Sequence, residues 1–181
     1  MRVITGKARG VQLKTPEGLT TRPTTDRVKE ALFSIIQFEI PTARVLDLFG
    51  GTGQLGIEAL SRGATSAVFV DAGEAACRLI KENLRRAKME SDGKVIRADY
   101  LDYLKRCREK FNIIFLDPPY AEVFLENALK CITEIDILET GGIIVAERPV
   151  GKELPWEFDG FTRSKDYKYG KTLLTIYRKN E

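Results

Sequence analysis

The chain has 181 residues, a length that suits one domain, and its 43% hydrophobic content excludes a disordered protein. It contains no histidine, which excludes Ser-His-Asp and Cys-His catalysis and most transition-metal sites. Three scattered cysteines without a CxxC pair predict neither a disulfide framework nor a zinc site, so we expect no metal. No apolar run approaches the ~20 residues of a membrane span. The first residues lack the apolar core of a signal peptide, so we expect a cytoplasmic protein.

The net charge of +3 is unevenly distributed along the chain. Residues 1–29 carry seven lysines and arginines against Glu17 and Asp26, which leaves a net charge of −2 for the remainder. A basic end on a nearly neutral body indicates a polyanionic partner. A solvated surface segment explains the same charges equally well, so charge alone does not decide.

The first forty residues predict a β-hairpin followed by a helix. Residues 2–14, "RVITGKARGVQLK", place β-branched and apolar residues around a Gly/Lys/Arg turn, which favours two short strands. In residues 20–36, Thr24, Thr25 or Asp26 caps a run of apolar residues at helical spacing. We therefore divide the chain into an extension, residues 1–40, and a larger domain, residues 41–181.

From residue 43 onward, strands alternate with helices. Near-continuous apolar strands in this alternation predict a parallel sheet that is covered by helices on both faces. Residues 161–178 differ, because two strand patterns meet at Tyr169-Gly170 and predict an antiparallel hairpin at the sheet edge. The expected parallel strands are "RVLDLFG" (44–50), "SAVFVD" (66–71), "KVIRAD" (94–99), "FNIIFLD" (111–117) and "GGIIVAE" (141–147).

A glycine-rich loop follows the first of these strands. Residues 51–56, "GTGQLG", fit G-x-G-x-x-G between a strand and a helix, and Asp71 ends the next strand where a ribose-binding acid belongs. Glycines let the backbone approach a ligand closely, and a helix N-terminus favours anionic groups. The loop predicts a nucleoside-containing cofactor, either a dinucleotide or S-adenosylmethionine.

Acidic residues favour S-adenosylmethionine over a dinucleotide. Asp47 lies just before the loop, where a carboxylate suits the cationic amino group of a methionine moiety and repels a pyrophosphate. Asp99 ends the third strand and can accept a hydrogen bond from an adenine amino group. In an open parallel sheet, ligands bind at the carboxyl ends of the strands near the switch point. We therefore expect Asp47, Asp71, Asp99 and Asp117 to gather at one edge.

The fourth strand ends in "DPPY", residues 117–120. Pro118 biases Asp117 away from helical geometry, and two prolines remove backbone donors. The result is a rigid stretch rich in acceptors, which suits an NH₂ group with two donors. Accepting both protons would free the lone pair of an aryl amine for attack on an electrophile, while Tyr120 stacks on the flat base. Positioning and electrostatics would carry such catalysis.

Together, "DLFGGTG" followed by "DPPY" resembles the class I S-adenosylmethionine-dependent methyltransferases that act on exocyclic amines. The whole chain is similar to the RsmD family, which methylates the N2 amine of one guanine in small-subunit (16S) ribosomal RNA. The segment "RPTTDRVKEALF", which generic methyltransferases lack, carries much of this resemblance. It implies a Rossmann-like fold with a seven-stranded, mostly parallel sheet, an antiparallel C-terminal hairpin and an N-terminal β-hairpin.

The site residues expected from residues and resemblance together form three sets. The target-amine set is Asp117, Pro118, Pro119 and Tyr120. The cofactor-binding set is Asp47, Phe49, Gly50, Gly51, Gly53, Asp71, Ala72, Asp99 and Tyr100. The RNA-binding set is Arg2, Lys7, Arg9, Arg22, Arg27, Lys29 and Lys168. We expect a monomer that acts on ribosomal RNA, in the small subunit or an assembly intermediate, with no membrane contact.

Three alternatives stay open. An adenine-N6 methyltransferase acting on DNA or RNA shares an acid-Pro-Pro-aromatic motif. A nicotinamide oxidoreductase shares the glycine loop but gives no reason for "DPPY". A non-catalytic RNA-binding module could keep the fold, although Asp117 and the intact loop count against it.

Overall fold

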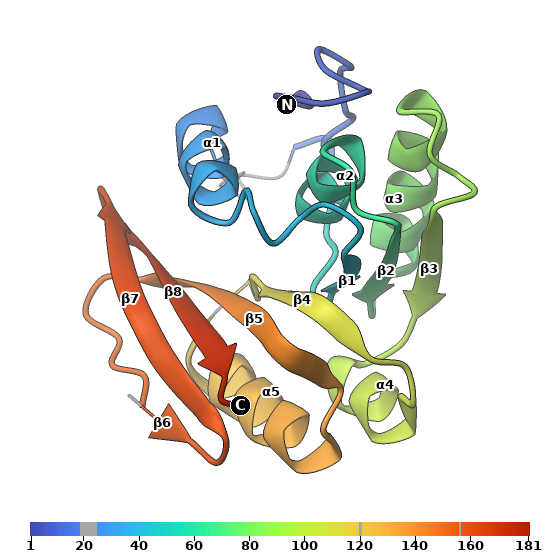
Figure 1. The fold of residues 1–181 in the computed structure, drawn as a ribbon. Helices are drawn as coiled ribbons and strands as arrows, with labels where there is room; N and C mark the ends of the chain where they lie inside the picture. Colours follow the sequence, from blue (N-terminus) through green and yellow to red (C-terminus); the bar gives the residue numbers. More distant parts are fainter. Residues whose placement is uncertain (19–24, 120, 156) are drawn as a thin grey trace.

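A mixed β-sheet forms the centre of the molecule in the computed structural model, which describes residues 1–18, 25–119, 121–155 and 157–181. The eight strands of this sheet lie in the order β3-β2-β1-β4-β5-β8-β7-β6 (Figure 1). The parallel part contains β1 (Arg44–Asp47), β2 (Ser66–Asp71), β3 (Gly93–Arg97), β4 (Phe111–Leu116) and β5 (Leu138–Pro149). The antiparallel part contains β6 (Glu157–Phe158), β7 (Phe161–Tyr169) and β8 (Thr172–Lys179). The seven predicted strands are confirmed, and β6 is a two-residue addition at the edge.

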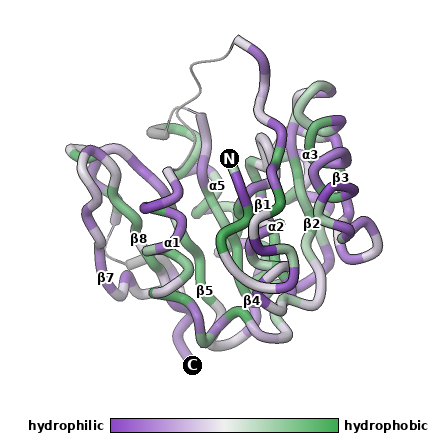
Figure 2. The backbone as a smooth tube through the Cα atoms, turned by 90° about the horizontal axis from the view of Figure 1, so that it is seen from above, coloured by the Kyte–Doolittle hydropathy of each residue, from purple (hydrophilic) through white to green (hydrophobic). Residues whose placement is uncertain are grey.

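Within the described residues, five helices cover both faces of the sheet, as the apolar strands predicted. Consecutive strand residues point to opposite faces, so that Val45 is buried in one core and Leu46 in the other. The first core is covered by α1 (Asp26–Ile35), α2 (Gln54–Ser61) and α3 (Glu74–Arg86), and the second by α4 (Tyr100–Arg106) and α5 (Ala121–Ile135). Hydrophobic colour follows β5 inside the molecule, whereas β7 at the edge is largely hydrophilic (Figure 2). No helix in the described ranges has the length and apolar character that crossing a membrane requires.

The chain reverses its direction of travel across the sheet between β1 and β4. It runs from β1 outward through β2 to β3, and then returns to place β4 on the other side of β1. The carboxyl ends of β1 and β4 therefore flank the switch point at which open parallel sheets bind ligands. The antiparallel hairpin also reaches this edge, because Pro149 at the end of β5 pairs with Thr172, and Thr172 pairs with Tyr169.

The N-terminal residues form a close antiparallel turn instead of the predicted hairpin of two strands. One bridge joins Arg2 to Gln12, and the Val3 N–H donates to the Val11 carbonyl at 3.0 Å. The turn packs onto α2, where the Lys7 N–H donates to the Ser61 carbonyl at 2.9 Å. Gly6 has a φ of +94°, and a Cβ on it would lie 1.9 Å from the Ser61 carbonyl oxygen. Contact with α2 therefore determines the path of this segment.

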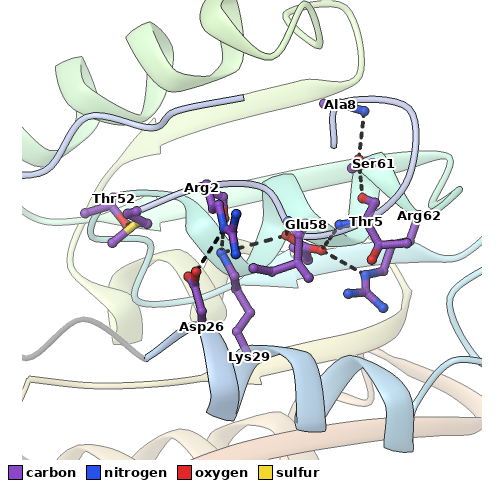
Figure 3. A network of polar contacts seen from close by, with 11 residues as sticks. Arg2, Thr5, Ala8, Asp26, Lys29, Thr52, Glu58, Ser61 and Arg62 are labelled. Atoms are coloured by element: carbon purple, nitrogen blue, oxygen red, sulfur yellow. Dashed lines mark hydrogen bonds and ion pairs between the residues drawn. The ribbon is translucent and has the colours of Figure 1, made fainter. Parts of the chain in front are cut away.

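A buried polar network attaches the N-terminal turn to α1 and α2 (Figure 3). The Glu58 carboxylate of α2 accepts hydrogen bonds from the backbone N–H groups of Ile4 (2.9 Å) and Thr5 (3.0 Å). It also pairs with Arg62 at 2.9 Å and with the Lys29 ammonium of α1 at 3.8 Å. The side chains of Lys29 and Glu58 are fully buried. Both thus belong to the interior of the fold, and α1 starts as predicted with Thr25 as its N-cap.

Candidate active site

The structure gathers the four predicted acids at the carboxyl edge of the parallel sheet. Asp47 and Asp71 are the last residues of β1 and β2, and Asp99 and Asp117 follow closely after β3 and β4. Parallel pairing of β3, β2, β1 and β4 brings these ends to one side. A backbone hydrogen bond joins two of these strand ends directly, because the N–H of Ala98, just before Asp99, donates to the Asp71 carbonyl at 3.0 Å.

Asp71 holds the glycine loop in place. One carboxylate oxygen accepts from the Gly51 N–H at 2.9 Å, and the other accepts from the Gly73 N–H at 2.8 Å. Gly51 and Gly53 have φ angles of +56° and +81°, which side chains other than glycine rarely adopt. A Cβ on Gly50 would lie 2.7 Å from the Ile80 side chain of α3. The loop is therefore a tight backbone cradle with a carboxylate at its rim, a construction that fits the ribose and nearby groups of a nucleoside cofactor.

Asp47 lies beneath this loop and is only 1% exposed. Its carboxylate accepts from the Gly56 N–H at 3.2 Å and so supports the first turn of α2. Burial, with a smaller contribution from Asp71, raises the pKa of Asp47 to about 7, although the hydrogen bond from Gly56 opposes this shift. A buried carboxylate in this state gains from a nearby cation, which is the property expected of a group that faces a methionine amino group.

Asp99 begins α4 and lies beside an aromatic group. Its side chain accepts from the N–H groups of Leu101 (2.9 Å) and Asp102 (3.2 Å), which makes it the N-cap of the helix. The next residue, Tyr100, places its ring 5.1 Å from that of Phe49 in the glycine loop. Both rings belong to the expected cofactor set, and the exposed Ala72 lies just after Asp71.

The target-amine motif follows β4 directly. Asp117 is half-buried, Pro118 is buried and Pro119 is exposed, while Tyr120 lies outside the described residues. Burial raises the pKa of Asp117 well above its usual range, and the carboxylates of Glu147 and Asp47 raise it further. Asp117 is thus held among acids at the switch point, where a hydrogen-bond donor or a cation would be favoured.

Glu147 is a neighbour that the sequence reasoning missed. Leu116, the last residue of β4, pairs with Ala146 of β5, so Asp117 follows β4 beside Glu147 of β5, whose carboxylate raises its pKa. The available signal was the strand "GGIIVAE", which ends on an acid as the other strands do.

The expected RNA-binding residues have different environments. Arg2 and Lys7 are exposed and pair with Asp26 at 3.1 Å and Asp92 at 3.2 Å. The expectation that Lys29 binds RNA is wrong. Its ammonium is fully buried against Glu58 and donates to the Arg2 carbonyl, which leaves no surface for a phosphate. Arg9, Arg27 and Lys168 are exposed, and Arg22 lies outside the described residues.

Comparisons with known proteins agree with this geometry. The protein family described as Conserved hypothetical protein 95 matches residues 1–178. Ribosomal RNA small subunit methyltransferase D of Escherichia coli is 31% identical over 99% of this chain and 90% of its own length. A Bacillus subtilis relative, YlbH, whose name assigns it provisionally to the rRNA methyltransferases, is 42% identical over 99% of both chains. The solved structure of Escherichia coli yhhF covers 99% of this chain and 98% of that chain with a TM-score of 0.91 and 29% identity.

These likenesses run from end to end and include the glycine loop and the "DPPY" segment within the matched residues. The Rossmann-like class I methyltransferase fold is thereby confirmed, and so is S-adenosylmethionine as the expected cofactor. The chain belongs to the RsmD family of methyltransferases.

Proposed function

We propose that this protein transfers a methyl group from S-adenosylmethionine to the exocyclic N2 amine of a specific guanine in small-subunit ribosomal RNA. The observation that carries the proposal is the position of Asp117 and its two prolines at the switch point, next to the glycine loop. Relatives from Escherichia coli and Haemophilus influenzae, the latter 36% identical over 85% of this chain, are named ribosomal RNA small subunit methyltransferase D. Their names support the choice of RNA as substrate.

The chemistry requires little more than positioning. S-adenosylmethionine supplies an electrophilic methyl group on a sulfonium; the amine nitrogen forms a bond to this methyl as the bond from carbon to sulfur breaks, and the nitrogen then loses a proton. Asp117 accepts a hydrogen bond from the amine and orients its lone pair toward the methyl. The raised pKa of Asp117 favours its protonated form in the free protein, and a bound cation lowers this pKa, so that the carboxylate meets the amine ionised.

The proposed substrate surface combines exposed basic residues from three segments. Exposed basic residues lie on the N-terminal turn, on α1 and on the β7–β8 hairpin, whose tip reaches the carboxyl edge. Contacts with phosphates would position the RNA, and the target base would leave its stack to reach Asp117. We assign this role to Arg2, Lys7, Arg9, Arg27 and Lys168, and we also retain Arg22.

We further propose that residues 1–40 act as the RNA-binding extension and residues 41–181 as the methyltransferase domain, working as a monomer in the cytoplasm. A small basic surface can contact few bases, so it discriminates poorly between RNA sequences. An assembled small subunit or its precursor is therefore the favoured substrate.

The test is transfer of labelled methyl from S-adenosylmethionine to small subunits that lack the modification, followed by mass spectrometry of the nucleosides. N2-methylguanosine that disappears with Asp117→Ala supports the proposal. N6-methyladenosine would assign the protein to the adenine-N6 enzymes, which share the acid-Pro-Pro-aromatic motif. No transfer by a protein that still binds S-adenosylmethionine would contradict the proposed substrate.

A further inference from the structure

Phe124 lies on the first turns of α5, shortly after the target-amine motif. Phe124 is 38% exposed, although α5 otherwise buries residues such as Leu125 and Leu129 in the core. Large exposed apolar side chains are few in the described part of the chain; they are Phe38, Val123, Phe124 and Val150. An exposed aromatic ring beside a predicted ligand site is the kind of feature that binds a flat ligand.

Phe124 contacts two rings of the expected cofactor set. Its ring centroid lies 5.4 Å from that of Tyr100 and 6.2 Å from that of Phe49, with interplanar angles of 69° and 72°. These edge-to-face arrangements are favourable in themselves. They join three segments that are far apart in sequence: the glycine loop, the start of α4 and the start of α5.

The place of these rings indicates which ligand they receive. Tyr100 directly follows Asp99, the acid expected to accept from the adenine amino group, and Phe49 directly precedes the glycines. Tyr100 is 8% exposed, so its ring is mostly covered, whereas Phe124 still offers surface. Phe49 is partly exposed and Phe124 is exposed, so the most open ring of the group is the one contributed by α5.

We propose that Phe124 completes the adenine subsite for S-adenosylmethionine as a positioning residue, by packing its ring against the base. The inference rests on the proposed cofactor site. Because α5 starts right after residues 117–120, the same contact links adenine binding to the placement of the target-amine motif.

The experiment measures binding of S-adenosylhomocysteine and of adenosine by calorimetry, without RNA. Phe124→Ala is expected to weaken both ligands by the same factor of about ten, because the lost contact is to the base they share. Phe124→Tyr keeps the ring and is expected to restore most of the affinity. Val123→Ala is the matched control, since Val123 is 66% exposed in the same turn and has no ring.

Steady-state kinetics with small subunits separate a cofactor role from a target role. The expected result for Phe124→Ala is a raised KM for S-adenosylmethionine with an unchanged KM for subunits. Unchanged binding of S-adenosylhomocysteine, or a raised KM for subunits alone, overturns the inference. If Phe124→Ala lowers the unfolding temperature, Phe124→Leu replaces it, because leucine keeps the apolar contacts of α5 and lacks the flat ring. A wild-type protein that bound neither ligand would instead contradict the cofactor assignment itself.

Discussion

Two groups of charged side chains in this molecule have opposite surroundings. In the N-terminal network, Glu58 accepts from two backbone N–H groups and pairs with Lys29 and Arg62. At the carboxyl ends of β1 and β4, Asp47 and Asp117 lie near other carboxylates, and the pKa of each is raised. The first group is compensated by the fold and stabilises it. The second group holds negative charge together at an energetic cost, which is the pattern expected where a cationic or hydrogen-bond-donating ligand completes the site.

The largest expected effect comes from removing Asp117. Asp117→Ala is expected to lower the rate of methyl transfer by about 10³-fold, because an acceptor for the target amine and its proton is lost. The same change removes a group whose burial opposes ionisation, so the unfolding temperature should stay the same or rise. Rates on small subunits and thermal unfolding check both effects. A substantial residual rate would assign the amine to another acceptor.

The compensated network should respond in the opposite way. Lys29→Met leaves the buried Glu58 carboxylate without one cation and is expected to lower the free energy of unfolding by roughly 3 kcal/mol. Burial lowers the pKa of Lys29, and the carboxylates of Glu58 and Asp26 offset only part of this shift, so the ammonium depends on these partners to stay charged in the native fold. Denaturant unfolding measures the loss. Arg27→Met, an exposed change on the same helix, is the control and should leave stability nearly unchanged. Equal stability of Lys29→Met and wild type would show that the ion pair is dispensable.

Asn83 connects the two regions, and its loss should have a smaller effect. This fully buried amide of α3 accepts from the Lys14 N–H at 2.7 Å and donates to the carbonyls of Lys14 at 3.0 Å and Thr52 at 2.9 Å. It therefore joins the end of the N-terminal turn to the glycine loop. Asn83→Leu is expected to cost about 2 kcal/mol of unfolding free energy and to weaken binding of S-adenosylhomocysteine.

Asn83→Asp serves as a second variant, because it keeps the acceptor for the Lys14 N–H but turns a carboxylate oxygen, in place of the donating NH₂, toward the carbonyls of Lys14 and Thr52. Its stability at neutral pH should fall below that of wild type and recover toward low pH, where the protonated carboxyl regains one donor. A loss of stability with unchanged ligand binding would show that Asn83 holds the N-terminal turn without influencing the loop.

The sequence predicted the features that depend on local pattern and missed those that depend on contacts between distant segments. Strand ends, the glycine loop and the four acids were predictable because each depends on local pattern and on the rule that parallel strands end at one edge. The burial of Lys29 was not, since its partner Glu58 is in a different helix and charge alone does not show exposure. The contacts of Phe124 with Tyr100 and Phe49 join three separate segments, and Glu147 reaches Asp117 only through strand pairing. The acid at the end of "GGIIVAE" is visible in the sequence, but these contacts themselves arise from tertiary packing between segments that are distant in the chain.

The pH dependence of cofactor binding tests the charge of Asp47, at the end of β1, most directly. With a pKa of about 7 in the free protein, Asp47 gains a negative charge as the pH rises through 7, so affinity for the cationic S-adenosylmethionine should increase across that range. Asp47→Asn keeps an acceptor for the Gly56 N–H, and is expected to bind about tenfold more weakly at pH 8 with a flatter profile. Since the chain has no histidine, an imidazole cannot produce this titration. Asp117, whose pKa is also raised, is controlled for by repeating the profile with Asp117→Asn.

Stability should change in the opposite direction to affinity in the same variant. A carboxyl whose pKa is higher in the folded than in the unfolded state holds its proton better when folded, so wild-type stability should fall as the pH rises from about 4 to 7. Asp47→Asn has no proton to lose and should be more stable than wild type at pH 8, with the difference shrinking toward pH 4. Thermal unfolding across this range measures the difference. If Asp47→Asn binds S-adenosylmethionine less tightly yet unfolds at a higher temperature, the negative charge of Asp47 destabilises the fold and serves ligand binding. Lower stability of Asp47→Asn at every pH would instead group Asp47 with Glu58 among the compensated charges.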